Sequence, residues 1–336
     1  MDQEHPIMEH PFAKSVSQVE KYKKLLEIIA PDDVLAIVIN ADPDAIASAM
    51  ALKRLFWRRV KKVHIYRTNV IKRADNLALV RLLKVDLVYF REHPEGITRW
   101  AIVDSQPHHD ERLARHRFDI IIDHHPPGDL SVAPFVDIRE QYGANSSIMT
   151  EYLKAARIKP SPKLATALFY GIKTDTDNFA RNSILGDIEA FKYLYRFANI
   201  NTIKKLEFSE ITRGTLKSIK FAIDNLSLYK DRAFIFMGRV KEPDLLVIIA
   251  DFFLRMAEAT WCIVAGVYGQ RLIVIFRNAG FRLDAGKVAQ RLFGEWGPAG
   301  GHKSAARAEI SIQDLPGGLN DMERISEFLR DRIKAI

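Results

Sequence analysis

Residues 34–52, VLAIVINADPDAIASAMAL, combine an apolar run, a short acidic turn and a stretch of small residues. The run from Val34 to Ile39 is continuously apolar and rich in β-branched residues, which is typical of a parallel strand covered on both faces. Residues 45–55 then follow a helical pattern. Asp42 and Asp44 therefore lie at the carboxyl end of a strand, the edge at which open α/β sheets bind ligands. Two carboxylates at this edge predict a site for a divalent cation.

The same turn also fits a helix start that holds no ligand. Asp42 would be the N-cap, Pro43 the first helical residue, and Asp44 a first-turn acid that complements the helix dipole. Caps of this kind open many ordinary helices, and for the turn taken alone this interpretation is the stronger one. Whether the turn binds a cation or only caps a helix therefore depends on residues elsewhere in the chain.

The composition limits the class of protein. The chain has 336 residues, enough for two domains, and its 48% hydrophobic and 27% charged residues are typical of a soluble globular protein. The N-terminus, MDQEHPIMEH, is polar and acidic, and no apolar stretch approaches the ~18 residues that span a membrane. We therefore expect a cytoplasmic protein with no membrane association. Cys262 is the single cysteine, which excludes an intrachain disulfide.

The chain is basic, with 50 Lys and Arg against 42 Asp and Glu and a formal charge of +8. Basic residues gather in residues 53–62. This excess favours an anionic ligand only weakly, because a solvated basic face explains such a run more often. No RNA-recognition, zinc-finger or helix-turn-helix signature accompanies it.

Strands and helices alternate through the first part of the chain. Residues 15–30 favour an amphipathic helix. Short apolar strands are expected at residues 34–39, 63–66, 87–90, 100–103 and 119–122, with helices at 77–83 and 110–115. This alternation predicts an α/β domain with a doubly wound parallel sheet. The pattern turns helical over residues 146–197, and we assign residues 1–197 to this domain.

A second, smaller mixed α/β domain is predicted for residues 225–336, after a polar helical linker at 198–224. Strands are expected at residues 226–229, 233–238, 262–268 and 272–277, the last two as a hairpin, and helices at 245–257 and 285–293. Near the end comes the glycine-rich segment WGPAGGHKSAARAEI, residues 296–310. Its glycines let the backbone approach a ligand closely, and His302 can donate to a phosphate oxygen.

Carboxylates and histidines recur after apolar runs of the first domain. Asp104 follows AIV, the triplet Asp123, His124 and His125 follows III, and Asp175 follows GIKT. We interpret these, with the turn at 42–44, as four strand ends that bring acids to one sheet edge, which is costly without cations because carboxylates repel one another. Each Asp alone fits a cap, but the set predicts a metal centre. Imidazole with carboxylates suits Mn²⁺ better than Ca²⁺ or Mg²⁺, with Mg²⁺ as an alternative, and the lack of cysteine ligands argues against structural zinc.

These segments resemble the motifs of a known superfamily. NADPDAIAS (40–48), AIVDSQ (101–106), IDHHPPG (122–128) and YGIKTDTDNF (170–179), in this order, look like the four motifs of the DHH phosphoesterases. IFRNAG (275–280) and GGHKSAA (300–306) resemble the DHHA1 substrate-binding domain of that superfamily. The likeness extends over roughly residues 34–310. It is greatest for the branch of nanoRNases, pAp phosphatases and exopolyphosphatase-related proteins.

The resemblance implies a Mn²⁺-dependent phosphoesterase with a substrate cleft between its two domains and two adjacent metal sites. One site would be formed by Asp44, Asp104, His124 and Asp175. The other would include Asp42 and Asp104, with Asp104 bridging the two ions. Two adjacent metal ions acidify a bridging water molecule and hold the attacking and leaving oxygens of the reaction. His125 would face the substrate phosphate, and we assign catalytic roles to Asp104, Asp123 and His125.

The second domain would hold the substrate from the other side. The residues assigned to this role are His125, Arg277, Gly300, Gly301 and His302. The implied substrate is a small phosphorylated nucleotide or a short single-stranded oligonucleotide of the pAp, nanoRNA or linear-dinucleotide type. Polyphosphate and pyrophosphate are the alternatives.

Two positions depart from the pattern of the relatives. A histidine usually stands four residues before the first motif Asp, where this chain has Val38, and a glycine usually stands at the position of Arg307. The first metal site is therefore expected to be the weaker. The departures also favour an alternative, a nucleotide-binding or regulatory protein with weak or lost hydrolysis. Nothing in the sequence indicates the oligomeric state, and a homodimer remains open.

Overall fold

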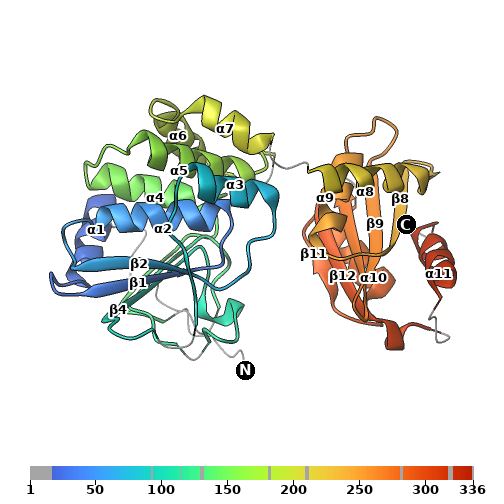
Figure 1. Ribbon diagram of the computed structural model, residues 1–336, viewed down its shortest axis with the longest axis horizontal. Coiled ribbons are helices and arrows are strands. Elements are labelled where there is room, and N and C mark those ends of the chain that lie inside the picture. Colours follow the sequence, from blue (N-terminus) through green and yellow to red (C-terminus); the bar gives the residue numbers. More distant parts are fainter. Residues whose placement is uncertain are drawn as a thin grey trace, which may run out of the picture. The chain divides into compact units, whose positions relative to one another are not determined.

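The computed structural model folds into two units, residues Met1–Glu210 and Ile211–Ile336 (Figure 1). The structure describes the following residues: 17–91, 94–114, 116–128, 132–180, 183–208, 212–280, 283–316 and 321–334. Each unit is built on its own six-stranded sheet and has its own apolar core.

The sheet of the first unit is parallel throughout, with the strand order β3-β2-β1-β4-β5-β6. Its strands are β1 (Val34–Ile39), β2 (Lys62–Arg67), β3 (Val88–Tyr89), β4 (Arg99–Val103), β5 (Ile120–Asp123) and β6 (Phe135–Ile138). The predicted parallel α/β sheet is confirmed, and β6 is an addition to it. The strand order reverses between β1 and β4, so the carboxyl ends of these two strands form the switch point at which such sheets bind ligands.

Seven α-helices accompany this sheet in the described residues: α1 (Gln18–Glu27), α2 (Pro43–Leu55), α3 (Ala74–Leu82), α4 (Asn145–Ala155), α5 (Pro162–Asp175), α6 (Leu185–Tyr195) and α7 (Ile200–Glu207). Side chains alternate between the faces of a strand. Figure 1 shows helices such as α2, α4 and α5 along one face of the sheet. On that face Ile37 and Val103 belong to the same core as Leu168 of α5. On the other face Val38 and Ile102 pack with apolar side chains of connecting segments.

Two segments differ from the sequence prediction. The helix expected at residues 110–115 is instead a 3₁₀ turn at Pro107–His109 followed by turns through residue 114, and residue 115 lies outside the described part. The segment expected as a linker, residues 198–224, is divided between the units. Ile203 and Leu206 of α7 are buried in the first core, whereas Ile219 and Ala222 of α8 (Arg213–Asp224) are buried in the second. The helices of this segment are amphipathic but polar on average, so the average composition did not reveal that each has an apolar face that is buried in a core.

The second unit is a mixed sheet with the order β11-β12-β10-β9-β8-β7. Its strands are β7 (Leu226–Tyr229), β8 (Arg232–Arg239), β9 (Trp261–Tyr268), β10 (Arg271–Asn278), β11 (Ala299–Gly301) and β12 (Ala305–Ser311). Only β8 and β9 pair in parallel in the described ladder. The helices α8 and α9 (Asp244–Phe253) pack on one face, and α10 (Ala285–Phe293) and α11 (Met322–Lys334) on the other. The predicted smaller mixed domain is confirmed.

Every helix in the described part of the chain is too short or too polar to cross a membrane.

Candidate metal centre

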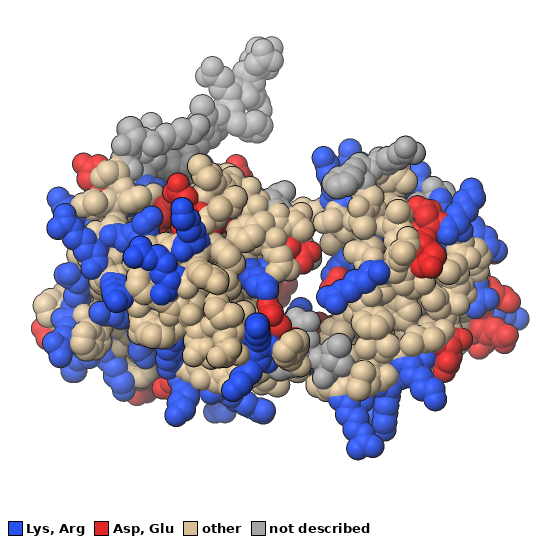
Figure 2. Space-filling model, turned by 90° about the horizontal axis from the view of Figure 1, so that it is seen from above, with Lys and Arg blue, Asp and Glu red and all other residues tan. Residues whose placement is uncertain are grey.

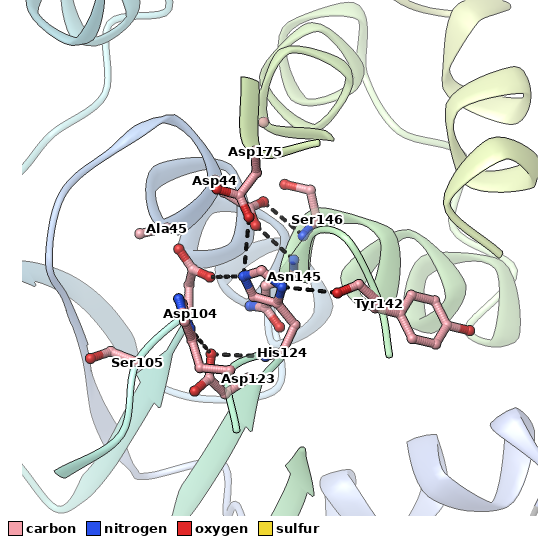
Figure 3. Close-up of polar contacts among 12 residues, drawn as sticks. Asp44, Ala45, Asp104, Ser105, Asp123, His124, Tyr142, Asn145, Ser146 and Asp175 are labelled. Atoms are coloured by element: carbon pink, nitrogen blue, oxygen red, sulfur yellow. Dashed lines mark hydrogen bonds and ion pairs between the residues drawn. The ribbon is translucent and has the colours of Figure 1, made fainter. Parts of the chain in front are cut away.

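The candidate centre lies where β1 and β4 end (Figure 3). Asp42 is the N-cap of α2, and its Oδ1 accepts a hydrogen bond of 2.9 Å from the N–H of Ala45. The capping interpretation is thus confirmed for this oxygen. Asp104 directly follows β4 with φ at 56°, a left-handed conformation that non-glycine residues adopt mainly where their surroundings impose it. Its N–H is held by the carbonyl of Ile122 in β5 at 3.0 Å.

His124, the residue after β5, has a ring orientation fixed from behind. Its Nδ1 lies 3.1 Å from the carbonyl oxygen of Tyr142. A carbonyl can only accept, so Nδ1 carries a proton and Nε2 is the atom presented to the centre. Nε2 lies 3.3 Å from Asp104 Oδ1 and 3.1 Å from Asp175 Oδ2. A histidine whose rear nitrogen is bonded to a carbonyl is the usual arrangement of a metal-ligating imidazole.

Asp44 is fixed by the amino end of another helix. Its two carboxylate oxygens accept hydrogen bonds from the backbone N–H groups of Asn145 (2.6 Å) and Ser146 (2.8 Å), which open α4. The helix dipole favours an anion at this point. Each oxygen keeps a further lone pair, so Asp44 remains able to bind a cation. An alanine in place of Gly171 of α5 would bring its Cβ within 3.0 Å of Asp44 Oδ1, so this glycine leaves room for the carboxylate.

Two groups of side chains have ligand atoms within 4.8 Å of one another. The first is Asp44, His124 and Asp175, and the second is Asp104, His124 and His125. Asp42 belongs to neither group among the described residues. The prediction that Asp175 ends a strand is wrong, because it is the last residue of α5. Tyr170 to Ile172 are buried as part of a helix, and a short apolar run does not distinguish that from a buried strand.

The electrostatics of these residues suit a bound cation. Burial, with repulsion between the carboxylates, raises the pKa of Asp42 to about 6, that of Asp44 to about 7, and that of Asp104 well above its ordinary value. Burial on its own lowers the pKa of His124, but its contacts with Asp104 and Asp175 raise it to about 12. Asp104 Oδ1 and His124 Nε2 are buried and face one another at 3.3 Å, and neither makes a hydrogen bond of good geometry within the described residues. A divalent cation between these atoms would satisfy all of them, so the residues present fit a metal site.

His125 is oriented by a buried carboxylate. Asp123, the last residue of β5, accepts from His125 Nδ1 at 2.9 Å and from the backbone N–H of His124 at 2.8 Å. The hydrogen bond to Asp123 raises the pKa of His125, although burial opposes it. Asp123 is fully buried and holds the ring of His125 in place, and the catalytic role predicted for it from the sequence stays a prediction.

Other residues of the centre were not predicted. The side-chain amide of Gln106 donates to Asp123 Oδ2 at 2.7 Å and accepts from the N–H of Gly128 at 3.0 Å, so it ties the segment after β4 to the one after β5. Gln106 lies within the quoted motif AIVDSQ, which was the available signal. Tyr142 and Asn145 act through backbone atoms, which carry no signature of residue type.

The residues predicted for substrate binding all lie in the second unit, apart from His125. Gly300 and Gly301 of β11 line a cavity of about 440 Å³, together with Lys287 and Arg291 of α10. His302 is exposed directly after β11. Arg277 of β10 makes an ion pair of 2.5 Å with Asp251 of α9, and its contact with the substrate stays a prediction. Arg307 of β12 makes an ion pair of 2.6 Å with Glu309.

Residues 35–172 match the DHH family, N-terminal domain. These residues therefore form a DHH domain. Members of this family are phosphoesterases that depend on divalent metals, and the residues of the centre described above fall mainly within or directly after the matched region.

Relatives extend the likeness beyond the matched domain. An uncharacterized protein of Methanocaldococcus jannaschii is 34% identical over 299 residues, which cover 88% of this chain and 61% of that protein. An A-adding tRNA nucleotidyltransferase of Aquifex aeolicus is 24% identical over 318 residues, which cover 90% of this chain and 35% of that enzyme. This chain therefore spans less than two thirds of the length of either protein.

Solved structures share the fold. An exopolyphosphatase-related protein from Bacteroides fragilis superposes with a TM-score of 0.74 at 16% identity, covering 96% of this chain and 98% of that one. RecJ from Thermus thermophilus, in complex with Mn²⁺, gives a TM-score of 0.55 at 14% identity, covering 96% of this chain and 55% of that one. At these identities the likeness shows the fold alone.

Proposed function

We propose that this chain is a Mn²⁺-dependent phosphoesterase that hydrolyses a small phosphorylated nucleotide or a short single-stranded oligonucleotide. The observation that carries the proposal is the position of His124. Its Nε2 lies within 3.3 Å of two carboxylates that come from different elements, while its Nδ1 is held by a backbone carbonyl. Buried carboxylates without a protein cation are typical of a site built for a metal ion.

The side chains divide the chemistry between them. Asp44, Asp104, His124 and Asp175 would hold the metal, which when bound acidifies a water molecule and neutralises charge on the phosphoryl group. Asp44 is kept in place by the α4 N–H groups and His124 by the Tyr142 carbonyl. Asp123 accepts from Nδ1 of His125 and raises the pKa of the ring, which favours the imidazolium form, whose second N–H can donate to a phosphate oxygen. Orienting donors before the substrate binds is what makes such contacts effective in the transition state.

The phosphate-binding part of the proposal is supported by the second unit. Its cavity combines two cations, Lys287 and Arg291, with the backbone of Gly300 and Gly301, a combination that suits a phosphate group. We infer that His302, beside this cavity in the chain, contributes to the same contact. His302→Ala should then raise the KM for nucleotide substrates more than it lowers kcat.

The test is a phosphate-release panel with Mn²⁺, run beside metal analysis of the purified protein. The panel contains pAp, a linear dinucleotide, a short oligoribonucleotide, polyphosphate and pyrophosphate, each repeated with Mg²⁺. Release from one of the first three, lost in Asp104→Asn, is the expected result. Release from pyrophosphate or polyphosphate alone would show that the substrate is an inorganic phosphate chain and not a nucleotide. A protein that binds no divalent ion would overturn the proposal.

A nucleotide-binding or regulatory protein with little turnover is the second candidate, and Val38 is the observation that favours it. Val38 is fully buried in an apolar cluster with Ala36 and Ile102, so it supplies no ligand to the centre. Tight nucleotide binding with no turnover at saturating Mn²⁺ would select this candidate. The retained acids and His124 favour the enzyme.

A further inference from the structure

A pocket of about 470 Å³ lies at the other end of the first unit from the metal centre. We call it the basic pocket; its lining includes Lys53, Arg54, Trp57, Lys84 and Lys163, with apolar residues at its base such as Ile65 and Leu164. The volume falls within the range of small-molecule sites. Four of the lining side chains are cationic and one, Asp86, is acidic.

The position of the pocket follows from two antiparallel helices. α2 begins at the metal centre, with Asp42 as its cap, and ends at the pocket with Lys53 and Arg54 in its last turn. α5 begins at the pocket, with Lys163 in its first turn, and ends at the centre with Asp175. A helix of this length spans about 20 Å. The basic pocket is therefore a separate site from the metal centre.

The fold accounts for only part of the positive charge in the pocket. Lys163 Nζ donates to the backbone carbonyl of Lys84 at 3.1 Å, which holds the side chain but supplies no full negative charge. Lys53 and Arg54 complement the negative end of the α2 dipole. Lys163 is unfavourable for its own helix, because it adds a positive charge to the positive end of the α5 dipole. The first turn of α5 contains no acidic residue that would offset this charge. Among the residues that the structure describes, no carboxylate lies within 4.0 Å of Lys53, Lys84 or Lys163. An anion in the pocket would compensate all of these charges.

Trp57 adds a recognition element for a planar group. Its side chain is 56% exposed at the rim of the pocket, although a large aromatic residue is normally buried. The guanidinium carbons of Arg54 and Arg58 lie 4.9 Å and 4.4 Å from the ring centroid, within cation–π range. Both guanidinium groups lie over the ring, so a nucleobase would stack on the exposed indole in place of one of them or on the guanidinium plane itself.

We propose that the basic pocket is a second binding site, specific for a phosphorylated nucleotide, with the phosphate among Lys53, Lys84 and Lys163 and the base against Trp57. The face of the first unit seen in Figure 2 carries mostly Lys and Arg among its charged side chains, which attracts an anion from a distance. The ligand is a free nucleotide or one nucleotide of a single strand. The proposal does not depend on hydrolysis, because the pocket shares no residue with the metal centre.

The test is calorimetric titration of the full chain with a nucleoside monophosphate in EDTA, which removes metal-dependent binding. Lys53→Ala combined with Lys163→Ala should weaken binding at least tenfold. The matched control is Lys217→Ala with Lys220→Ala, two exposed lysines of α8 that make the same change in charge, and it should bind as the parent does. Circular dichroism and thermal unfolding verify that every variant is folded. Equal affinity in both double variants would overturn the site.

Trp57→Ala tests the base. It should weaken the monophosphate at least fivefold and leave tripolyphosphate, which has no base, unchanged. Equal losses for both ligands, or none for either, would overturn the nucleotide assignment. Oligoribonucleotides of increasing length then distinguish the two ligands. If the pocket binds one nucleotide of a single strand, affinity should rise with length; if it binds a free nucleotide, affinity should not rise. Repeating the titration with Asp104→Asn separates the proposals, because that variant abolishes the hydrolysis proposed above and should keep this binding.

Discussion

Buried Asp137 and the buried carboxylates of the metal centre both lie in the first unit, and their surroundings are built in opposite ways. Asp137 of β6 is surrounded by donors: Lys21 Nζ at 2.9 Å, Arg139 Nη2 at 2.6 Å and the Tyr152 hydroxyl at 2.6 Å. Burial raises its pKa, but these partners outweigh burial and lower the pKa below its usual range. The carboxylates of the metal centre have no lysine or arginine partner in the described structure, and their pKa values are raised.

The difference separates a structural ion cluster from a functional one. A buried charge is costly unless it is paired and hydrogen-bonded. Around Asp137 the fold supplies the cation itself, so nothing further is needed. Around Asp104 the fold supplies only histidine and more acids, and the compensating charge must come from outside the chain.

Of the substitutions that test this difference, Arg139→Ala should change the free energy of unfolding most. Arg139 is buried, bonded to Asp137 and to Glu151, and its removal leaves Asp137 with too little positive charge. Loss of one partner of a buried ion pair costs about 3–5 kcal/mol. We expect the free energy of unfolding, measured in urea, to fall by this amount. The exposed Arg59→Ala, with a change within about 0.5 kcal/mol, serves as the control; an equally small change in Arg139→Ala would show that the Asp137 cluster does not stabilise the fold.

Asp104→Asn should give the reverse outcome. The substitution keeps the shape of the side chain and removes one of several carboxylate charges that repel one another, beside which the described structure places His124 but no lysine or arginine. Unfolding of the metal-free protein should be unchanged or shifted toward higher stability, within about 1 kcal/mol, whereas Mn²⁺ content and turnover should fall, turnover by roughly 10²–10³-fold. A folded Asp104→Asn protein with the Mn²⁺ content and rate of the parent would remove Asp104 from the centre.

The two groups should also respond oppositely to pH. The pKa values of Asp42 (about 6) and Asp44 (about 7) exceed the 3.8 of an ordinary Asp, so between these limits the folded state binds more protons and its stability falls as pH rises. The raised pKa of His124 acts in the same direction above pH 6.5. For Asp137, with a lowered pKa, the stabilisation is present above pH 4 and is lost on further acidification.

Urea unfolding in EDTA should therefore give a free energy of unfolding higher at pH 5 than at pH 8, by on the order of 1–2 kcal/mol. Asp42→Asn with Asp44→Asn should reduce that difference. Saturating Mn²⁺ should reverse it, because the metal binds the deprotonated ligands and stabilises the folded state. A metal-free protein that becomes more stable toward pH 8 would contradict the raised pKa values.

Local sequence patterns predicted most of the fold. The continuous apolar run of β1 and the hairpin across Gly269, which has φ at 59°, are determined by neighbouring residues. The expected helix at 110–115 was wrong because its charged residues are used in a turn, where Asp110 is bonded to Arg112. Short edge strands such as β6 depend on pairing with a distant strand, which a local pattern does not reveal.

The sequence predicted the side chains of the candidate site, but it did not predict the residues whose backbone atoms hold those side chains. Asp44, Asp104, His124 and Asp175 each follow a recognisable apolar run, even though Asp175 ends a helix. The N–H groups that hold Asp44 come from residues about a hundred positions away, and any residue type could supply them. Arg277 was assigned to the substrate from its motif position, and its partner Asp251 lies on another element.

Val38→His should have the smallest effect and tests the position at which this chain departs from its relatives. Val38 lies in β1, paired with Ile102, which is two residues before Asp104. Added imidazole near Asp42 supplies a ligand that suits Mn²⁺, so the weaker metal site should tighten by roughly threefold to tenfold, and turnover at limiting Mn²⁺ should rise with it.

The expected cost lies in the apolar cluster. Val38 is fully buried beside Ala36 and Ile102, and a ring that finds no metal there would lose about 1–3 kcal/mol of unfolding free energy. Val38→Leu, which also enlarges the side chain but offers no ligand, is the matched control. Mn²⁺ should therefore stabilise Val38→His more than Val38→Leu in thermal unfolding. Equal stabilisation of the two variants would mean that position 38 faces only the apolar core, and that the metal centre of this chain is complete without a histidine in β1.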